Sequence, residues 1–86
     1  MRWEEISWIL RGRLKKKLIL LLDKPTTATI LAKILKTHRS TISYILLQMR
    51  NKGLLVCLDK NQPYNRFYEL TSKGKLIQKK VIELNK

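Results

Sequence analysis

Apolar residues recur along this chain at two different spacings. Over most of its length they lie three to four residues apart, which places them on one face of an α-helix. This spacing predicts helices over residues 3–10, 13–23, 28–35, 39–52 and 72–84. From Leu54 the spacing falls to two, which predicts strands over residues 54–58 and 66–70 joined by a polar turn.

Glycine, proline and threonine residues mark the boundaries between these elements. Gly12 separates the first two helices, and Pro25 ends the second because proline cannot continue a helix. Thr27 and Thr71 are predicted to cap the helices that follow them, since a threonine hydroxyl can accept from an amide of the first turn. Gly53 is predicted to end the fourth helix in a left-handed conformation.

The core is predicted from the apolar side of each helix. In the second helix the inward residues are Leu14, Leu18, Leu21 and Leu22, with Lys15, Lys16 and Lys17 facing out. In the third and fourth helices the predicted inward residues are Ile30, Leu31, Ile34 and Leu35, then Ile42, Ile45 or Leu46, and Met49. In the last helix, one side carries Leu76, Ile77, Val81 and Leu84. Ala32 is small where a neighbouring helix must approach closely.

Residues 1–86 are predicted to form one domain, because no linker, repeat or low-complexity segment interrupts the pattern. Its parts are an N-terminal helical extension (1–12), two helices and a first strand (26–58), a hairpin tip (59–66) and a C-terminal helix (71–86). Thr26 and Thr27 suit either a short strand or a cap. The fold class is mainly α with a β-hairpin, in the order α-α-β-α-α-β-β-α.

The net charge changes this picture most. Nineteen Lys and Arg residues against six Asp and Glu give a formal net charge of +13. Such self-repulsion is typical of proteins that bind a polyanion, and nucleic acid is favoured over an anionic membrane surface. Heat-adapted proteins also carry many charges, but they usually balance Lys with Glu.

Several other classes of function are disfavoured by the sequence. The longest apolar run, residues 18–22, is too short to span a membrane, and the N-terminus does not resemble a signal peptide. Cys57 alone cannot form an internal disulfide or a zinc site; it is more typical of a buried residue than of a redox sensor. Glycine-rich phosphate loops, paired carboxylates and a nucleophile–histidine set are absent. We therefore expect a cytoplasmic, non-enzymatic protein without a cofactor.

The third and fourth helices together suggest a helix-turn-helix. They are joined by a tight turn, and the fourth begins with Arg, Ser, Thr and Tyr residues that can reach base edges in a major groove. With the following hairpin this order is that of a winged helix-turn-helix. The predicted partner is double-stranded DNA.

Arg39 is the best candidate for reading a base, because a guanidinium can bond guanine at two acceptors. Ser43 suits a base or phosphate, and Tyr44 suits a phosphate or a thymine methyl group. Ser40 and Thr41 could instead cap the helix, as could Thr37 or His38. The predicted DNA-binding residues of this region are Lys36, Thr37, His38, Arg39, Ser40, Ser43, Tyr44 and Arg50.

The hairpin tip is predicted to contact the neighbouring DNA backbone or minor groove. Arg66 is the first choice for a narrow, negative groove. Its alternative is a weak ion pair with Asp59 or Glu69 across the hairpin. The predicted contacts of the tip are Lys60, Asn61, Gln62, Asn65 and Arg66.

A homodimer is expected, because one recognition helix reads too few base pairs for specificity in a genome. Both ends of the chain carry more apolar side chains than one small core needs. The predicted interface residues are Trp3, Trp8, Ile77, Val81 and Leu84. The alternative is that the first helix simply covers the domain's own core.

Three segments carry a resemblance to a known family. They are Leu31-Ala32-Lys33-Ile34-Leu35, Arg39-Ser40-Thr41-Ile42-Ser43 and Met49-Arg50-Asn51-Lys52-Gly53-Leu54-Leu55. Together they resemble the core of MarR/ArsR-type regulators, and Tyr68-Glu69-Leu70-Thr71-Ser72-Lys73-Gly74 is similar to the segment that closes the wing in these proteins. The beginning of the chain and Arg66-Phe67-Tyr68 are similar to small archaeal regulators, a group that includes regulators of the archaellum operon.

The resemblance implies a winged helix-turn-helix fold and transcription regulation through DNA binding. The chain also departs from the family. ArsR-type metal sensors carry clustered cysteines on the recognition helix, whereas this chain has only Cys57. Full-length MarR proteins have additional helices that form a dimer and a ligand pocket, and 86 residues leave little room for such a pocket. No metal or small-molecule ligand is therefore expected.

Two other functions fit the same fold. One is a sequence-tolerant architectural protein, which would bind random duplex as tightly as any operator. The other is a winged-helix module whose basic face binds an acidic protein. The polar start of the fourth helix favours DNA over protein, although exposed Leu47 fits protein contact as well.

Overall fold

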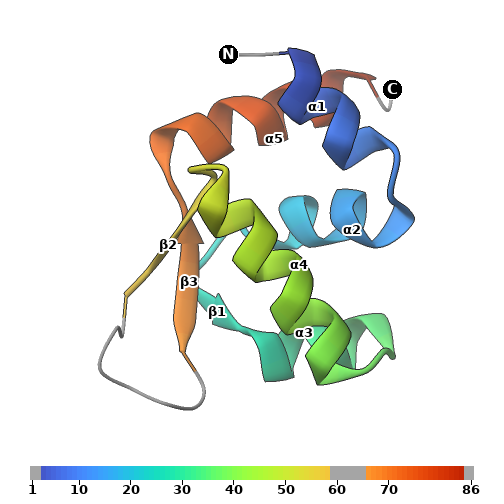
Figure 1. Ribbon diagram of the computed structural model, residues 1–86, viewed down its shortest axis with the longest axis vertical. Helices are drawn as coiled ribbons and strands as arrows, with labels where there is room; N and C mark the ends of the chain where they lie inside the picture. Colours follow the sequence, from blue (N-terminus) through green and yellow to red (C-terminus); the bar gives the residue numbers. More distant parts are fainter. Residues whose placement is uncertain (1–2, 59–65, 85–86) are drawn as a thin grey trace.

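The computed structural model describes residues 3–58 and 66–84. Their elements are α1 (Trp3–Leu10), α2 (Arg13–Leu21), β1 (Thr26–Thr27), α3 (Ala28–Leu35), α4 (Arg39–Asn51), β2 (Leu55–Cys57), β3 (Phe67–Leu70) and α5 (Ser72–Leu84). This order is the predicted one, and the bounds of α1, α3 and α5 agree with the sequence prediction. The fold is mainly helical, with a small sheet along one edge (Figure 1).

The sheet has the antiparallel order β1-β3-β2, so β3 lies in the middle. Thr26 lies opposite Tyr68 in one pairing, and Leu55 lies opposite Leu70 in the other. The hairpin extends beyond β2, since the amide of Leu58 donates to the carbonyl of Phe67 at 2.9 Å. The predicted hairpin is confirmed, and β1 shows that the two threonines form a strand.

The caps predicted from the sequence mark where helices begin and end. The Thr27 hydroxyl accepts from the amide of Ile30 at 3.2 Å, and the Thr71 hydroxyl accepts from the amide of Gly74 at 3.1 Å. Gly53 has φ +79°, the left-handed conformation predicted for it. Both threonine caps and the glycine stop are therefore confirmed.

The helix α2 ends two residues earlier than predicted, at Leu21. Its last turn is held by a residue far away in the chain. The Gln78 side chain of α5 donates to the carbonyl of Ile19 at 2.8 Å and to the Asp23 carboxylate at 2.9 Å. This contact satisfies one of the carbonyls that a helix C-terminus leaves without a partner in its own helix.

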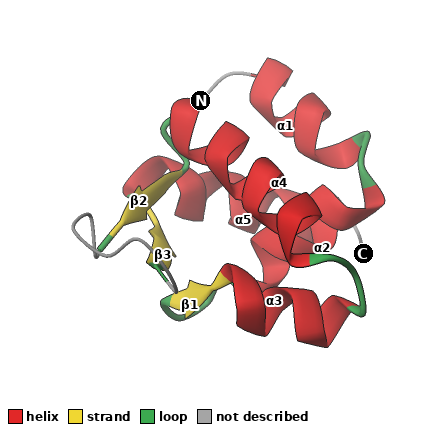
Figure 2. Cartoon of the chain, turned by 60° about the horizontal axis from the view of Figure 1, so that its bottom comes forward, coloured by secondary structure: helices red, strands yellow, loops and turns green. Residues whose placement is uncertain are grey.

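The core lies where the five helices meet against one side of the sheet (Figure 2). The amphipathic pattern of α4 predicts its core side correctly, because Ile42, Ile45, Leu46 and Met49 are all buried. Residues from the other elements complete the cluster: Ile6, Ile9, Leu18, Ile19, Leu22, Ala28, Leu31, Ala32, Leu54, Leu55, Leu70, Ile77 and Val81.

Three residues predicted to face the core are instead exposed: Leu21, Ile30 and Ile34. On α5, Leu76 and Leu84 are exposed, whereas Ile77 and Val81 are buried. In α3 the reason is that the small side chains of Ala28 and Ala32 face the core, which turns Ile30 and Ile34 to the opposite side of a short helix. In α2 the inward direction is shared by Leu18 and Ile19, so Leu21 points outward.

The first turn of α5 packs directly against the backbone of the hairpin. Gly74 is buried there, and a Cβ at this position would collide with the carbonyl oxygen of Leu54. The same carbonyl accepts from the amide of Thr71 at 3.0 Å. Only a residue without a side chain allows this approach.

Candidate nucleic-acid interface

The helix α4 presents a polar, basic side to solvent, opposite its core side. Its first turn lies beside α3, at the end of the molecule away from α1 and α5 (Figure 1). The exposed residues of this side are Arg39, Ser40, Ser43, Tyr44, Leu47 and Arg50. Tyr44 is 63% exposed, so its ring has no structural role in the core. The sequence therefore predicted correctly which side chains of α4 are exposed.

The turn before α4 contains a lysine in an unusual backbone conformation. Lys36 has φ 54° and ψ 48°, the left-handed region that usually favours glycine. The turn is closed by two hydrogen bonds, from the amide of Thr37 to the carbonyl of Ala32 at 3.0 Å and from the amide of Lys36 to the carbonyl of Lys33 at 3.3 Å. Lys33 and Lys36 are both exposed beside the start of α4.

We expect Lys36→Gly to stabilise the domain by about 1 kcal/mol. A side chain in the left-handed region costs about 1–2 kcal/mol, which glycine avoids. Part of this gain is lost because glycine increases the conformational entropy of the unfolded chain. Thermal unfolding would measure the effect. Lys36→Ala is the matched control, since it removes the same charge but keeps a Cβ. If alanine stabilises as much as glycine, charge repulsion and not backbone strain is the cause.

The alternative that the His38 side chain caps α4 is not realised. His38 occupies the N-cap position, but its side chain makes no capping hydrogen bond. The carbonyl of His38 accepts from the amides of Thr41 and Ile42 at 3.1 and 3.2 Å instead. The first amides of α4 therefore point outward without a side-chain acceptor, which adds to the positive potential of this helix end.

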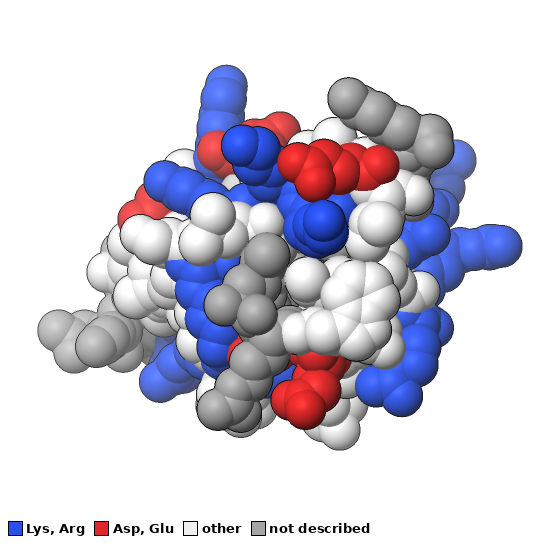
Figure 3. Space-filling view, turned by 90° about the horizontal axis from the view of Figure 1, so that it is seen from above, with Lys and Arg blue, Asp and Glu red and all other residues white. Residues whose placement is uncertain are grey.

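Acidic residues are absent from the whole segment between Asp23 and Asp59. This segment contains α3, α4 and the basic residues Lys24, Lys33, Lys36, Arg39, Arg50 and Lys52. The acids described by the structure lie in or next to α1, α2, β3 and α5. The view onto α1 and α5 shows them among Lys and Arg side chains (Figure 3). This uneven distribution of acidic residues can be seen in the sequence, but the prediction of individual DNA-binding residues did not use it.

Arg66 lies immediately before β3 and is half-buried. The other predicted wing contacts, Lys60, Asn61, Gln62 and Asn65, lie outside the described residues. The described part of the wing thus comprises its two strands and Arg66.

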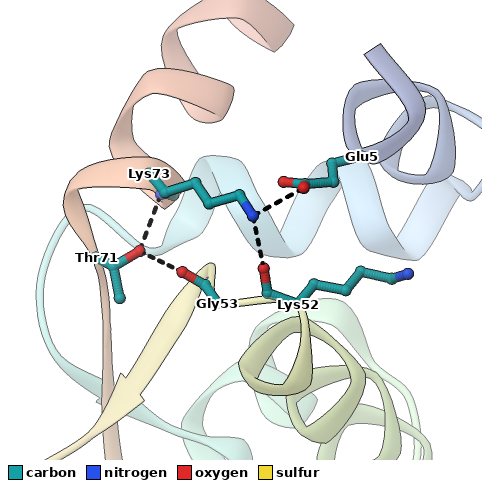
Figure 4. Close-up of polar contacts among 6 residues, drawn as sticks. Glu5, Lys52, Gly53, Thr71 and Lys73 are labelled. Carbon is teal, nitrogen blue, oxygen red and sulfur yellow. Dashed lines mark hydrogen bonds and ion pairs between the residues drawn. The ribbon is translucent and has the colours of Figure 1, made fainter. Parts of the chain in front are cut away.

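The end of α4 is tied to the rest of the domain by several hydrogen bonds. The amides of Gly53 and Leu54 donate back to the carbonyls of Arg50 and Met49 at 2.9 and 3.0 Å, the pattern that a left-handed glycine makes possible. The Thr71 hydroxyl donates to the carbonyl of Gly53 at 2.6 Å (Figure 4). The angle between α4 and the hairpin is fixed by these contacts.

Lys73 extends this connection to α1. Its ammonium group donates to the carbonyl of Lys52 at 3.1 Å and forms an ion pair with Glu5 at 2.8 Å (Figure 4). Glu5 is largely buried, with a side chain 13% exposed. Three elements, α1, α5 and the end of α4, therefore meet at one lysine.

The predicted dimer residues divide into three groups. Ile77 and Val81 are fully buried in the core, so the prediction that they contact a partner is wrong for this conformation. They fill the space between α5 and its neighbouring helices. Trp3 and Leu84 are exposed, at 60% and 46%. Trp8 is half-buried and packs against the core, with two lysine ammonium groups over its ring.

Within the described residues, no group of three or more His, Cys, Asp and Glu side chains could hold a metal ion. Cys57 is a buried, free thiol on β2. In the same part of the chain, no helix has both the length and the apolar character needed to cross a membrane.

The family follows from a sequence comparison. Residues 3–85 match the family model described as the N-terminal domain of the methanogenesis regulatory protein FilR1. The chain belongs to this family. The FilR1 N-terminal domain is a regulatory winged-helix type, so the winged-helix regulator predicted from the sequence is confirmed. No curated protein sequence is significantly similar to the chain.

Solved structures show the same fold at low sequence identity. The adhesin competence repressor AdcR from Streptococcus pyogenes aligns with a TM-score of 0.75 and 20% identity, over 86% of this chain and 56% of its own. A mutant of MepR from S. aureus has a TM-score of 0.77 and 17% identity, over 95% of this chain and 64% of its own. Lactococcus lactis ZitR in complex with DNA has a TM-score of 0.70 and 18% identity, over 81% of this chain and 49% of its own.

This member of the FilR1 N-terminal family thus spans about half to two-thirds of the length of those proteins. The likeness establishes the MarR-type winged-helix fold. The resemblance to ArsR-type proteins, and that to small archaeal regulators such as those of the archaellum operon, stays a prediction.

Proposed function

We propose that this domain binds double-stranded DNA in a sequence-specific manner and regulates transcription, with α4 in the major groove. The observation that carries the proposal is the exposed side of α4, which combines Arg39, Ser43 and Tyr44 on a segment without acidic residues. A partner of this side of α4 must accept hydrogen bonds and carry negative charge, as a major groove and its flanking phosphates do.

Two further observations support this proposal. The chain belongs to a family of regulatory proteins, and one structure with the same fold, that of ZitR, was solved in complex with DNA. The hairpin is held at a fixed angle to α4, so a duplex in contact with α4 would pass close to the wing. We propose that Arg66 and the tip residues bind the adjacent backbone or minor groove.

Within α4, we propose that Arg39 reads a guanine and that Ser40, Ser43 and Tyr44 contact neighbouring bases or phosphates. We propose that the exposed basic residues around the turn, Lys33, Lys36 and His38, contact the DNA backbone beside the groove. We propose the same for Arg50, which is exposed near the end of α4. Such contacts position the helix but carry little sequence information.

Selection of bound fragments from genomic DNA, followed by Arg39→Ala, tests the function. We expect selected fragments to be bound more tightly than random duplex. Arg39→Ala should cost about 1–3 kcal/mol and relax the preference at one base pair, since a bidentate contact contributes that discrimination. Anisotropy of a labelled duplex gives the affinities.

Lys79→Ala is the control for loss of one positive charge, because Lys79 is exposed on α5, away from α4. Equal affinity for random and selected duplex would identify an architectural protein instead. Failure to bind either duplex, with tight binding to an acidic protein, would overturn the proposal in favour of a protein-interaction module.

We further propose that the protein binds DNA as a homodimer in the cytoplasm, through the exposed residues Trp3 and Leu84 at the two ends of the described chain. A dimer would read two half-sites about one helical turn apart, which increases specificity. Sedimentation at tens of micromolar, with and without DNA, tests this. A monomer under both conditions would contradict it.

A further inference from the structure

Two lysine ammonium groups lie over the ring of Trp8, at the other end of α4 from Arg39. The Lys15 ammonium lies 4.2 Å from the centroid of the Trp8 ring, and the Lys52 ammonium lies 4.8 Å from it. Arg11, in the turn between α1 and α2, is close enough to Lys15 to act on its charge. We call Trp8, Arg11, Lys15 and Lys52 the Trp8 cluster.

The cluster is assembled from parts that are distant in the sequence. Trp8 belongs to α1, Lys15 to α2, and Lys52 follows the last residue of α4. Lys52 is about 20 Å along the helix axis from Arg39, given a rise of about 1.5 Å per residue. The Trp8 cluster is therefore separate from the surface that Arg39, Ser43 and Tyr44 form.

In the part of the chain that the structure describes, Arg11, Lys15 and Lys52 form no ion pair with a carboxylate. Glu5, which is close by on α1, is paired with Lys73. Glu4 lies one turn before Trp8 but forms no ion pair with a described lysine or arginine. Burial lowers the pKa of Lys15, and the positive charges of Arg11 and Lys52 lower it further. The folded protein thus holds these cations together against their mutual repulsion.

We propose that the Trp8 cluster is a binding site for a phosphate group. The two ammonium nitrogens lie at the same ring, 4.2 and 4.8 Å from its centroid. A phosphate bound at this ring can accept charge-assisted hydrogen bonds from the lysine ammonium groups at about 2.7–2.9 Å, and the positive charge of Arg11 adds to its attraction. A phosphate suits the site better than a carboxylate, because it offers more acceptor oxygens and more charge to three cations.

The phosphate can come from two sources, a DNA backbone or a free anion. In the first case the cluster adds a backbone contact beyond the C-terminal end of α4 and rests on the proposed function. In the second case the cluster binds a phosphate-bearing small molecule, and the contacts from Lys73 to Glu5 and Lys52 lie directly beside it. The two sources are separated by titrating each one.

The first titration uses inorganic phosphate and the full chain labelled with ¹⁵N, in chloride at constant ionic strength. The two tryptophans give two indole N–H signals, and a Trp3→Phe variant assigns them. We expect a saturable shift of the Trp8 signal only. Trp3, which is exposed at the start of α1, is the internal control. Lys15→Gln and Lys52→Gln should each weaken this binding tenfold or more, whereas Lys52→Arg should retain it.

The second titration measures duplex binding as a function of salt. If the cluster binds a DNA phosphate, Lys52→Gln should lower the slope of log K against log salt by about 1, whereas Lys79→Gln on α5 should act only through net charge and leave the slope nearly unchanged. A phosphate response with an unchanged slope assigns the site to a free anion. No Trp8 shift together with an unchanged slope overturns the proposal, and a wild-type chain that binds no duplex refutes the proposed function while leaving the phosphate titration valid.

Discussion

Duplex binding is expected to weaken by a factor on the order of 10³–10⁵ between 50 and 200 mM salt, the loss typical of a protein that makes about 6–10 phosphate contacts. The reason is the net charge of +13, together with the acid-free segment that contains α3 and α4. Each phosphate neutralised by Lys or Arg releases counterions, and added salt opposes that release. The measurement is the equilibrium constant for a labelled duplex over a series of salt concentrations.

Ser43→Ala serves as the control for this titration, because Ser43 carries no charge and lies on the same exposed side of α4. It should change the affinity without changing the slope. Lys33→Ala and Lys36→Ala should each reduce the slope by about 1. A slope near zero for the wild-type chain would refute DNA binding altogether.

Gly74→Ala is expected to destabilise the domain by about 1–3 kcal/mol or more, since it overpacks a tightly packed site. The new Cβ would collide with the carbonyl of Leu54 and press on the Leu70 side chain. Neither neighbour can move easily, because the carbonyl is hydrogen-bonded to Thr71 and Leu70 is buried. Alanine favours a helix by about 1 kcal/mol over glycine, so the measured loss is what remains after that gain. Chemical denaturation would give the free energy of unfolding.

Gly12→Ala is the matched control, since it makes the same change where a Cβ would meet only the flexible side chain of Lys15. We expect it to change the stability far less than Gly74→Ala. If the two variants unfold at the same denaturant concentration, the close approach of α5 to the hairpin is not what stabilises this part of the domain.

The sequence predicted features that depend on a few neighbouring residues. The caps at Thr27 and Thr71 and the stop at Gly53 follow from local chemistry, and the exposed side of α4 follows from the period of its apolar residues. The hairpin followed from the change of spacing at Leu54. Each of these predictions needed only one element and its flanks.

Features that depend on how distant elements pack were not predicted. Ile30 was predicted to be buried and Val81 to contact a partner, because a periodic stripe does not say which part of it the rest of the fold covers. The contacts of Lys73 and the lysines around Trp8 join residues from three elements. No spacing within one helix contains that information.

The hydrogen bonds from Thr71 to Gly53 and from Lys73 to Lys52 have a consequence for the thermodynamics of recognition. They hold α4 and the hairpin at one angle in the unbound protein. A ligand that contacts both elements then orders little of the backbone as it binds, so the entropic cost of association falls mainly on side chains such as Arg39 and Tyr44. The backbone is preorganised where α4 meets the hairpin, and the side chains are the part that adjusts on binding.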